Sequence, residues 1–191
     1  MIRVAILDDH PALSAGLTAV LRAEPGFAPV GTASHEQELW PLLARTRPDV
    51  VLVDYHLPGA DGLQLCRRIA TDPPAPAVVI YSAYADAMLA LAGRAAGAAA
   101  VAGKSAPARE LFDLLRRVAR GERLLPPVTP ELLAEAAGRL EPEDGPLLSL
   151  LLDGTSPADL CGLLRIEPRE LQWRTERMLS RLKVDVPAAA R

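Results

Sequence analysis

The chain has 191 residues, about half of them apolar, and a formal net charge of −3. This length suits one domain of ordinary size plus a smaller one, because domains cluster around roughly 100 to 150 residues, and the apolar half is enough to form a real core. The negative charge falls on the C-terminal third and the segment before it, which is the opposite of a basic nucleic-acid module.

The first part of the chain alternates short apolar runs with segments of helical period. Runs typical of strands are RVAILD (3–8), APVGTA (28–33), DVVLVD (49–54), AVVIYS (77–82) and AAAVAG (98–103). Apolar residues at helical spacing mark residues 13–23, 63–69 and 111–119. Five strands alternating with helices predict an α/β fold, a doubly wound parallel five-stranded sheet with right-handed crossovers. The Ala-rich stretch 92–103 fits a helix running into a strand at almost any position.

Prolines interrupt this pattern after Gly121, where ELLAEAAGRL can still form a short helix. We therefore expect one domain over residues 1–122, a linker over 123–139 and a small all-α domain over 140–191. The last part reads as three helices, in GPLLSLLLDG, SPADLCGLLRI and EPRELQWRTERMLSRLK. Gly154 is placed to end the first helix, Ser156 with Pro157 to cap and open the second, and Glu167 with Pro168 to open the third.

The two cysteines, Cys66 and Cys161, are far apart in sequence and neither has a partner at CxxC spacing. Two buried thiols in a reducing compartment explain them better than a disulfide or a zinc site. The first apolar run is cut off by Asp8 too early for a signal peptide, and no run approaches the roughly 20 apolar residues of a membrane span. We expect a soluble cytoplasmic protein with no membrane partner.

Charged and hydroxyl side chains stand where the predicted strands end. Asp8 and Asp9 follow the first strand, Asp54 the third, Ser82 the fourth and Lys104 the fifth. The carboxyl ends of parallel strands form the ligand crevice of such a sheet. Carboxylates gathered there repel one another unless a cation joins them, and hard oxygen ligands suit Mg²⁺. Together with a lysine, this set is what phosphoryl transfer to an aspartate requires.

Each of these residues taken singly has an ordinary explanation. Asp8 and Asp9 ahead of His10 and Pro11 can be a solvated turn and helix cap, and Asp54 an ordinary loop acid. A lysine after a strand is usually a solvated charge. Their joint placement at four strand ends favours the functional interpretation.

Residues 1–122 resemble the receiver domain of bacterial two-component response regulators (CheY-like), through LDDH (7–10), VDYHLPGADG (53–62), YSA (81–83) and GAAAVAGK (97–104). The resemblance implies that Asp54 accepts a phosphoryl group from a histidine kinase. It implies further that Asp8, Asp9, Asp54 and the main-chain carbonyl of His56 hold Mg²⁺. Ser82 would bond a phosphoryl oxygen and Lys104 would pair with it.

One position departs from the resemblance. An aromatic residue usually stands three residues before the lysine and swings inward on activation, but here that residue is Val101. The groups needed for phosphorylation are all present, so the departure concerns the coupling from phosphate to surface. His56 and Tyr84 are both bulky and are expected to shield the phosphoryl group from water.

Residues 140–184 resemble, without a gap, the four-helix helix-turn-helix output domain of the NarL/LuxR (FixJ) class. The apolar pattern is kept, and an inward-packing set at helical spacing in the last helix is Leu171, Thr175, Met178, Leu179 and Leu182. The resemblance implies DNA contacts from Arg169, Gln172, Trp173, Arg174 and Glu176. Two acids stand on this face, Glu170 and Glu176, and a carboxylate facing phosphates is repelled.

Two functions therefore stay open. In the first, phosphorylation of Asp54 drives dimerisation or frees the output domain, and a homodimer places two recognition helices in successive major grooves of double-stranded DNA to regulate transcription. In the second, the acidic helix with its exposed Trp173 binds a protein partner instead of DNA. A phosphatase is disfavoured, because such enzymes typically carry a second carboxylate where this chain has His56; we expect a regulator, not an enzyme.

Overall fold

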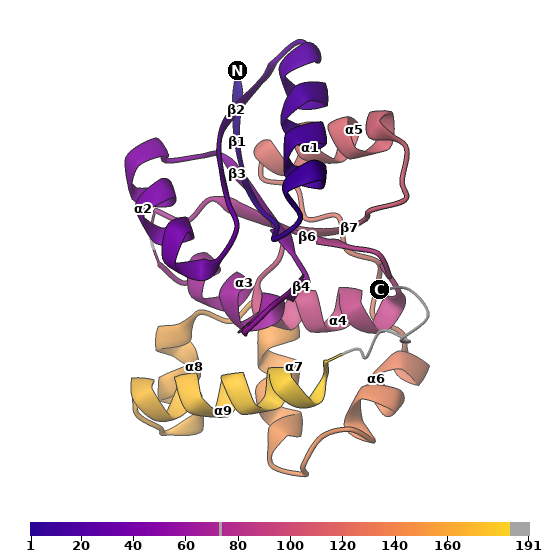
Figure 1. The fold of residues 1–191 in the computed structure, drawn as a ribbon. Coiled ribbons are helices and arrows are strands. Elements are labelled where there is room, and N and C mark those ends of the chain that lie inside the picture. The colour runs from indigo at the N-terminus through magenta and orange to yellow at the C-terminus, as the bar shows by residue number, and fades with distance from the viewer. Residues whose placement is uncertain (73, 184–191) are drawn as a thin grey trace.

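A computed structural model describes residues 1–72 and 74–183. Its N-terminal part is built on a parallel five-stranded sheet with strand order β2-β1-β3-β6-β7 (Figure 1). The strands are β1 (Ile2–Leu7), β2 (Phe27–Ala33), β3 (Val50–Asp54), β6 (Ala77–Ser82) and β7 (Ala100–Gly103). All five predicted strands are confirmed, and the order is that of a CheY-like doubly wound fold.

Helices cover both faces of the sheet. One face carries α1 (Pro11–Ala23) and α5 (Ala108–Ala119), and the other carries α2 (Glu36–Thr46), α3 (Gly62–Ala70) and α4 (Ala87–Ala96) (Figure 1). The alternation of side chains along each strand explains the two layers. Val4 and Ile6 pack into the apolar cluster under α1 and α5, while Ala5 and Leu7 pack into the cluster under α2, α3 and α4. A short antiparallel pair, β4 (His56–Leu57) and β5 (Ala60–Asp61), was not predicted. Strands of two residues carry no periodic signal.

The C-terminal part consists of helices α6 (Pro130–Ala137), α7 (Asp144–Leu152), α8 (Pro157–Leu164) and α9 (Pro168–Arg181). The predicted helix starts are confirmed. Ser156 caps α8 by accepting a hydrogen bond from the backbone N–H of Asp159, and Glu167 precedes α9 in an extended conformation. The described residues of 140–184 form three helices, and Val184 lies outside the described residues. The inward-packing set is buried as predicted, at Leu171, Thr175, Met178, Leu179 and Leu182.

The helical part packs directly on the sheet domain. α4 contacts α6, α7 and α9, and α3 contacts α9, so buried side chains of both parts form one cluster. α4 is buried on almost every side except at Ala87 and Arg94, as expected of an apolar helix enclosed between two layers. Arg94 also donates to the carbonyls of Leu125 and Pro126, both at 3.0 Å, which fixes the predicted linker against α4. None of the helices in the described part of the chain is long and apolar enough to cross a membrane.

Candidate functional site

The strand ends bring the predicted residues together. Asp54 is the last residue of β3, Asp8 follows β1, and both carboxylates are almost completely buried. Lys104, just after β7, reaches across the sheet edge: its Nζ lies 2.8 Å from Asp8 Oδ2 and 2.8 Å from Asp54 Oδ2. The ammonium thus bridges two buried carboxylates from different strands, as the strand-end argument predicted.

Acidic and imidazole groups crowd beside this bridge. Ligand atoms of Asp8, Asp9, His10 and Asp54 all lie within 4.8 Å of one another. The buried Oδ1 of Asp9 accepts no hydrogen bond among the described residues, although His10 Nδ1 is 3.0 Å away. A buried carboxylate oxygen without a donor, next to two further carboxylates, fits a hard divalent cation. The acidic cluster is therefore suited to a metal ion, and Asp8, Asp9 and Asp54 are the residues able to hold it.

His10 was not assigned to this site from the sequence. Its Nδ1 lies 3.2 Å from Asp8 Oδ1, and its backbone N–H donates to the same oxygen at 2.8 Å. Its position directly after two acids was the available signal. The sequence predicts a turn here, and the conformation of this turn places the imidazole beside the acids.

Burial and charge act on the site in opposite directions. Burial raises the pKa of Asp54 above its ordinary value of 3.8, although Lys104 and the backbone N–H of His56 hydrogen-bond to the carboxylate and work against that rise. For Lys104, burial favours the neutral amine, but hydrogen bonds to Asp54 and Asp8 outweigh it and raise the pKa of the ammonium. Lys104 therefore stays charged, and its charge opposes protonation of Asp54.

Ser82 is the last residue of β6, and its side chain hydrogen-bonds to the backbone two residues further along the chain. Its fully buried Oγ donates to the carbonyl of Tyr84 and accepts from the Tyr84 backbone N–H, both at 3.1 Å. The carbonyl of Ser82 accepts from the Lys104 backbone N–H at 2.7 Å. The hydroxyl is thus engaged with Tyr84 and would have to exchange that partner to meet a phosphoryl oxygen.

Gly62 packs closely against the backbone of Asp54 and Tyr55. A Cβ at Gly62 would lie 2.8 Å from the carbonyl oxygen of Tyr55 and 2.9 Å from that of Asp54, so only glycine fits there without movement. Asp61 caps α3 by accepting from the backbone N–H groups of Leu63 and Gln64. The start of α3 is therefore packed directly against the backbone of the Asp54 strand end.

The residues expected to affect switching lie around this centre. Val101 is half-buried and packs toward α4, where its Cγ2 would be 3.3 Å from a Cβ placed on Gly93. His56 is exposed and Tyr84 is half-buried, and the His56 imidazole meets the ring of Tyr55 edge-on at 4.5 Å. Their shielding of a phosphoryl group stays a prediction.

α9 presents the residues predicted to contact DNA. Arg169, Gln172 and Trp173 are exposed, with 55% of Trp173 accessible. Two of the others are engaged in pairs: Arg174 lies 2.6 Å from Glu170, and Glu176 accepts from Gln172 at 2.9 Å. The pair between Glu170 and Arg174 is the i to i+4 contact that the sequence offered.

Sequence reasoning missed Arg177 on the same helix. Its guanidinium lies 5.2 Å from the centre of the Trp173 ring, a cation–π contact between two exposed side chains. Its spacing four residues after Trp173 was the signal. By contrast Arg181 is paired within the helical part to Asp144 at 2.6 Å and to Glu141 at 2.8 Å.

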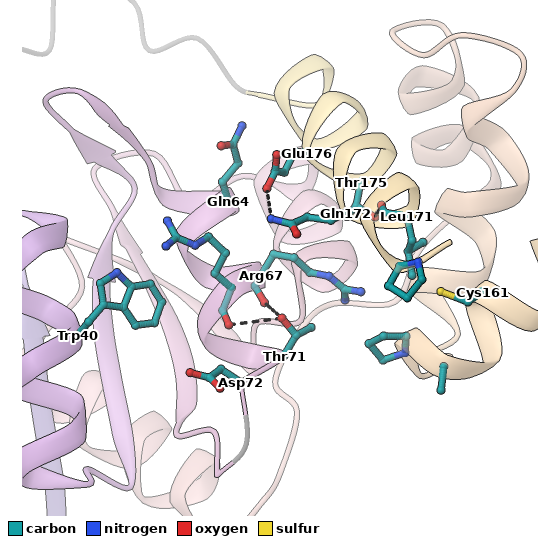
Figure 2. Close-up of a pocket in the computed structure, with 14 residues that line it drawn as sticks. Trp40, Gln64, Arg67, Thr71, Asp72, Cys161, Leu171, Gln172, Thr175 and Glu176 are labelled. Carbon is teal, nitrogen blue, oxygen red and sulfur yellow. Dashed lines mark hydrogen bonds between the residues drawn. The ribbon is translucent and has the colours of Figure 1, made fainter. Parts of the chain in front are cut away.

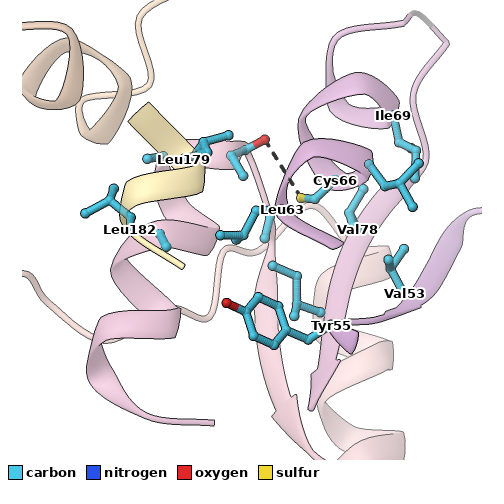
Figure 3. Close-up of a cluster of buried hydrophobic side chains, with 14 of the residues drawn as sticks. Val53, Tyr55, Leu63, Cys66, Ile69, Val78, Leu179 and Leu182 are labelled. Carbon is cyan, nitrogen blue, oxygen red and sulfur yellow. Dashed lines mark hydrogen bonds between the residues drawn. The ribbon is translucent and has the colours of Figure 1, made fainter. Parts of the chain in front are cut away.

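One edge of α9 is turned toward the sheet domain. Gln64 on α3 donates to Ser180 Oγ at 3.0 Å, and Lys183 lies 3.6 Å from Asp61. Figure 3 shows Leu179 and Leu182 gathered with Leu63 of α3 in the shared apolar cluster. The side of α9 that carries Gln172, Glu176 and Ser180 therefore faces the receiver-like part, in contact with it at Ser180 and across a hollow at Gln172 and Glu176.

Comparison with known proteins agrees with this geometry. The family model described as the response regulator receiver domain matches residues 4–116. The transcriptional regulatory protein LiaR of Bacillus subtilis is 31% identical over 140 residues, which span 73% of this chain and 63% of LiaR. The DNA-binding transcriptional activator DevR/DosR of Mycobacterium tuberculosis is 27% identical over 97% of this chain and 90% of its own length. A crystal structure of a LuxR-family two-component response regulator from Aurantimonas is 30% identical with a TM-score of 0.60, over 73% of this chain and 98% of that one.

Proposed function

Because this chain belongs to the response regulator receiver family and resembles its LuxR class, we propose that it is phosphorylated on Asp54 and thereby controls transcription through α9. The observation that carries the phosphorylation is the Lys104 bridge between the buried carboxylates of Asp8 and Asp54, beside an acidic cluster suited to a cation. The receiver spans residues 1–122, the linker 123–139 and the output domain 140–191. We place the protein in the cytoplasm, where a histidine kinase supplies the phosphoryl group.

Phosphoryl transfer uses groups whose positions are given above. An Asp54 oxygen attacks the phosphorus of a phosphohistidine, the O–P bond forms as the P–N bond breaks, and the imidazole leaves with the bonding electron pair and takes up a proton. Mg²⁺, held by Asp8, Asp9, Asp54 and the carbonyl of His56, would balance charge on the phosphoryl oxygens when bound. Lys104 is already within hydrogen-bonding distance of Asp54, so its ammonium supplies a second positive charge without moving far.

The phosphorylated state requires Ser82 to change partners. Its hydroxyl now donates to the Tyr84 carbonyl, and donating to a phosphoryl oxygen instead breaks that bond and frees the Tyr84 backbone. Residues 83–86 lead into α4, and α4 contacts the helical part through α6, α7 and α9. The exchange therefore provides a mechanical link from the phosphoryl group to the docked output domain.

DNA binding by α9 then requires its release from α3. The edge with Gln172 and Glu176 faces the receiver, while Arg169, Trp173 and Arg177 face solvent. A major groove cannot be entered from a side that α3 occupies. Support for DNA as the target comes from the likeness to DevR/DosR over nearly the whole chain. Release would also free two output domains to act as a homodimer on adjacent half-sites.

The alternative, a protein partner for α9, has its own observation. Glu170 and Glu176 are on the helix surface, and Trp173 with its stacked Arg177 forms the kind of aromatic and arginine pair found in protein interfaces. Under this alternative phosphorylation still frees α9. Only the macromolecule that it meets is different.

The test is selection of duplex DNA from a random library by the full-length protein, with and without Mg²⁺ and beryllofluoride, over a salt series. We expect sequence-selective binding that depends on beryllofluoride, falls steeply with salt, and is lost in the double variant Arg169→Ala with Arg174→Ala. Asp54→Asn should not respond to beryllofluoride and is the matched control. Absence of selective binding in both states, while Asp54 still takes up phosphate, would replace DNA by a protein partner. Turnover of a chromogenic phosphoester beyond one phosphate per chain would instead point to a phosphatase.

A further inference from the structure

A hollow between the two parts of the chain takes no part in the proposed phosphorylation. It has a volume of about 700 Å³ and lies between α3 on one side and α8 and α9 on the other, with Trp40 of α2 at one end (Figure 2). Ligand pockets commonly measure 300–1,000 Å³ and often lie at domain interfaces. Its volume is therefore in the range that holds a small organic molecule.

Arg67 and Arg68 bring positive charge to the lining of the cavity, and Asp72 and Glu176 bring negative charge. Arg67 is half-buried, and within residues 1–72 and 74–183 no hydrogen bond or ion pair reaches its guanidinium. Figure 2 shows this side chain pointing from α3 toward α8 and α9. The neighbouring Arg68 is different, because it pairs with Glu36 and lies 4.8 Å over the Trp40 ring. A half-buried guanidinium that pairs with none of the described carboxylates favours an anionic ligand.

The other walls limit what that anion can be. Pro157, Pro168 and Leu171 give an apolar surface opposite Arg67, which suits an aromatic or aliphatic body. Glu176 stands on the α9 wall, held by Gln172 at 2.9 Å, and would repel a doubly charged phosphate more than a singly charged carboxylate. The walls therefore match a small monocarboxylate with an apolar body.

We propose that this cavity binds a small apolar monocarboxylate through Arg67 and that the ligand holds the output domain docked on the receiver. The walls come from both parts of the chain, so a ligand that touches both favours the docked arrangement over the released one. By linkage, ligand and phosphorylation then weaken each other by the same factor. This second step rests on the proposed function, whereas the binding site itself does not.

Matched acid and amide pairs test the site directly. Benzoate with benzamide, and phenylacetate with phenylacetamide, are titrated into the full-length protein by calorimetry and ligand-observed NMR. We expect the acids to bind at millimolar concentrations or better, and each amide to bind at least about tenfold more weakly, because a hydrogen bond to a charged group is worth that much. Failure of both acids to bind at millimolar concentration overturns the proposal.

Two variants assign the binding to the cavity. Arg67→Met should reduce acid binding by about tenfold or more, and Arg68→Met, which removes a paired arginine from the same lining, should leave it nearly unchanged. Ala158→Phe keeps the arginine but fills the α8 wall, and should also abolish binding. Acid binding that survives both Arg67→Met and Ala158→Phe in folded protein overturns the proposal.

Beryllofluoride with Mg²⁺ tests the regulatory step. Acid affinity should fall in the activated protein, and the acid should weaken beryllofluoride uptake by an equal factor. Equal affinities in both states would overturn the role in docking. If the protein takes up no beryllofluoride at all, the proposed function fails, and the acid and amide comparison with Arg67→Met still decides the site.

Discussion

Gly62 offers a sharp test of how the phosphoacceptor is supported. In Gly62→Ala the new methyl group would lie within 3.0 Å of three backbone atoms of Asp54 and Tyr55, closer than real Cβ atoms approach. Backbone atoms at the end of a buried strand cannot step aside as a flexible side chain can. Overpacking of this kind lowers the free energy of unfolding by about 1–3 kcal/mol. The better helix propensity of alanine offsets only a fraction of about 1 kcal/mol at the first residue of α3. We expect a net loss of about 1–2 kcal/mol.

The control is Gly16→Ala in the middle of α1, where nothing lies within 4 Å of the added carbon. That variant should gain about 0.5–1 kcal/mol from helix propensity alone. Urea titrations of both variants measure the difference, and thermal unfolding should show Gly62→Ala about 5 °C below the parent. Phosphorylation by acetyl phosphate should be slower in Gly62→Ala only. Parental stability together with a parental phosphorylation rate in Gly62→Ala would refute the tight contact below Asp54.

Three further outcomes follow from the same contacts. Arg181→Ala leaves the buried Asp144 without its main partner and should lower the free energy of unfolding by about 2 kcal/mol in urea titration. The loss is smaller than for a fully buried pair, because Arg181 is partly exposed. A double-mutant cycle with Asp144→Asn that shows no coupling would contradict this. Burial raises the pKa of Asp54 in the folded protein, so ionisation of Asp54 destabilises the fold as pH rises above the ordinary pKa of 3.8. Asp54→Asn should therefore be more stable than the parent at neutral pH and lose that advantage in acid. A stability difference that stays constant across pH would exclude this explanation. Phospho-Asp54 should decay more slowly in the parent than in the double variant His56→Ala with Tyr84→Ala, and equal lifetimes would show that these side chains do not exclude water.

Much of the receiver part could be predicted because its signals are local. Each strand is a short apolar run ended by a chemically distinctive residue, and parallel pairing brings those ends to one edge whatever the helices between them do. That is why the sequence alone predicts that Asp8, Asp54 and Lys104 lie together. The helix starts at Ser156 and Glu167 were predictable for the same reason, since a helix start depends on a few neighbouring residues.

The rest depends on contacts that a one-dimensional pattern does not contain. His10 reaches the acids through the conformation of a turn, not through periodicity. The stretch around α4 was ambiguous because alanine suits a helix, a strand and a buried interface alike. Its burial on nearly every side became visible only when the helical part was seen to cover it. Which of the neighbours Arg67 and Arg68 pairs with Glu36 likewise depends on the tertiary packing, and it is Arg68 that does so.

The position of α3 bears on the missing aromatic residue at Val101. From Asp54 the backbone rests on Gly62, Gly62 begins α3, and α3 touches α9 through the Gln64 contact with Ser180. Asp61, which caps α3, also lies beside Lys183, which follows the end of α9. This series of packed contacts connects the phosphoacceptor with the docked helix inside one chain, and it runs through β3 and α3 without including β7. A displacement of the Asp54–Tyr55 backbone therefore reaches α9 without any movement at Val101, so the substitution of the aromatic residue removes one path between the site and the output helix and leaves this one in place.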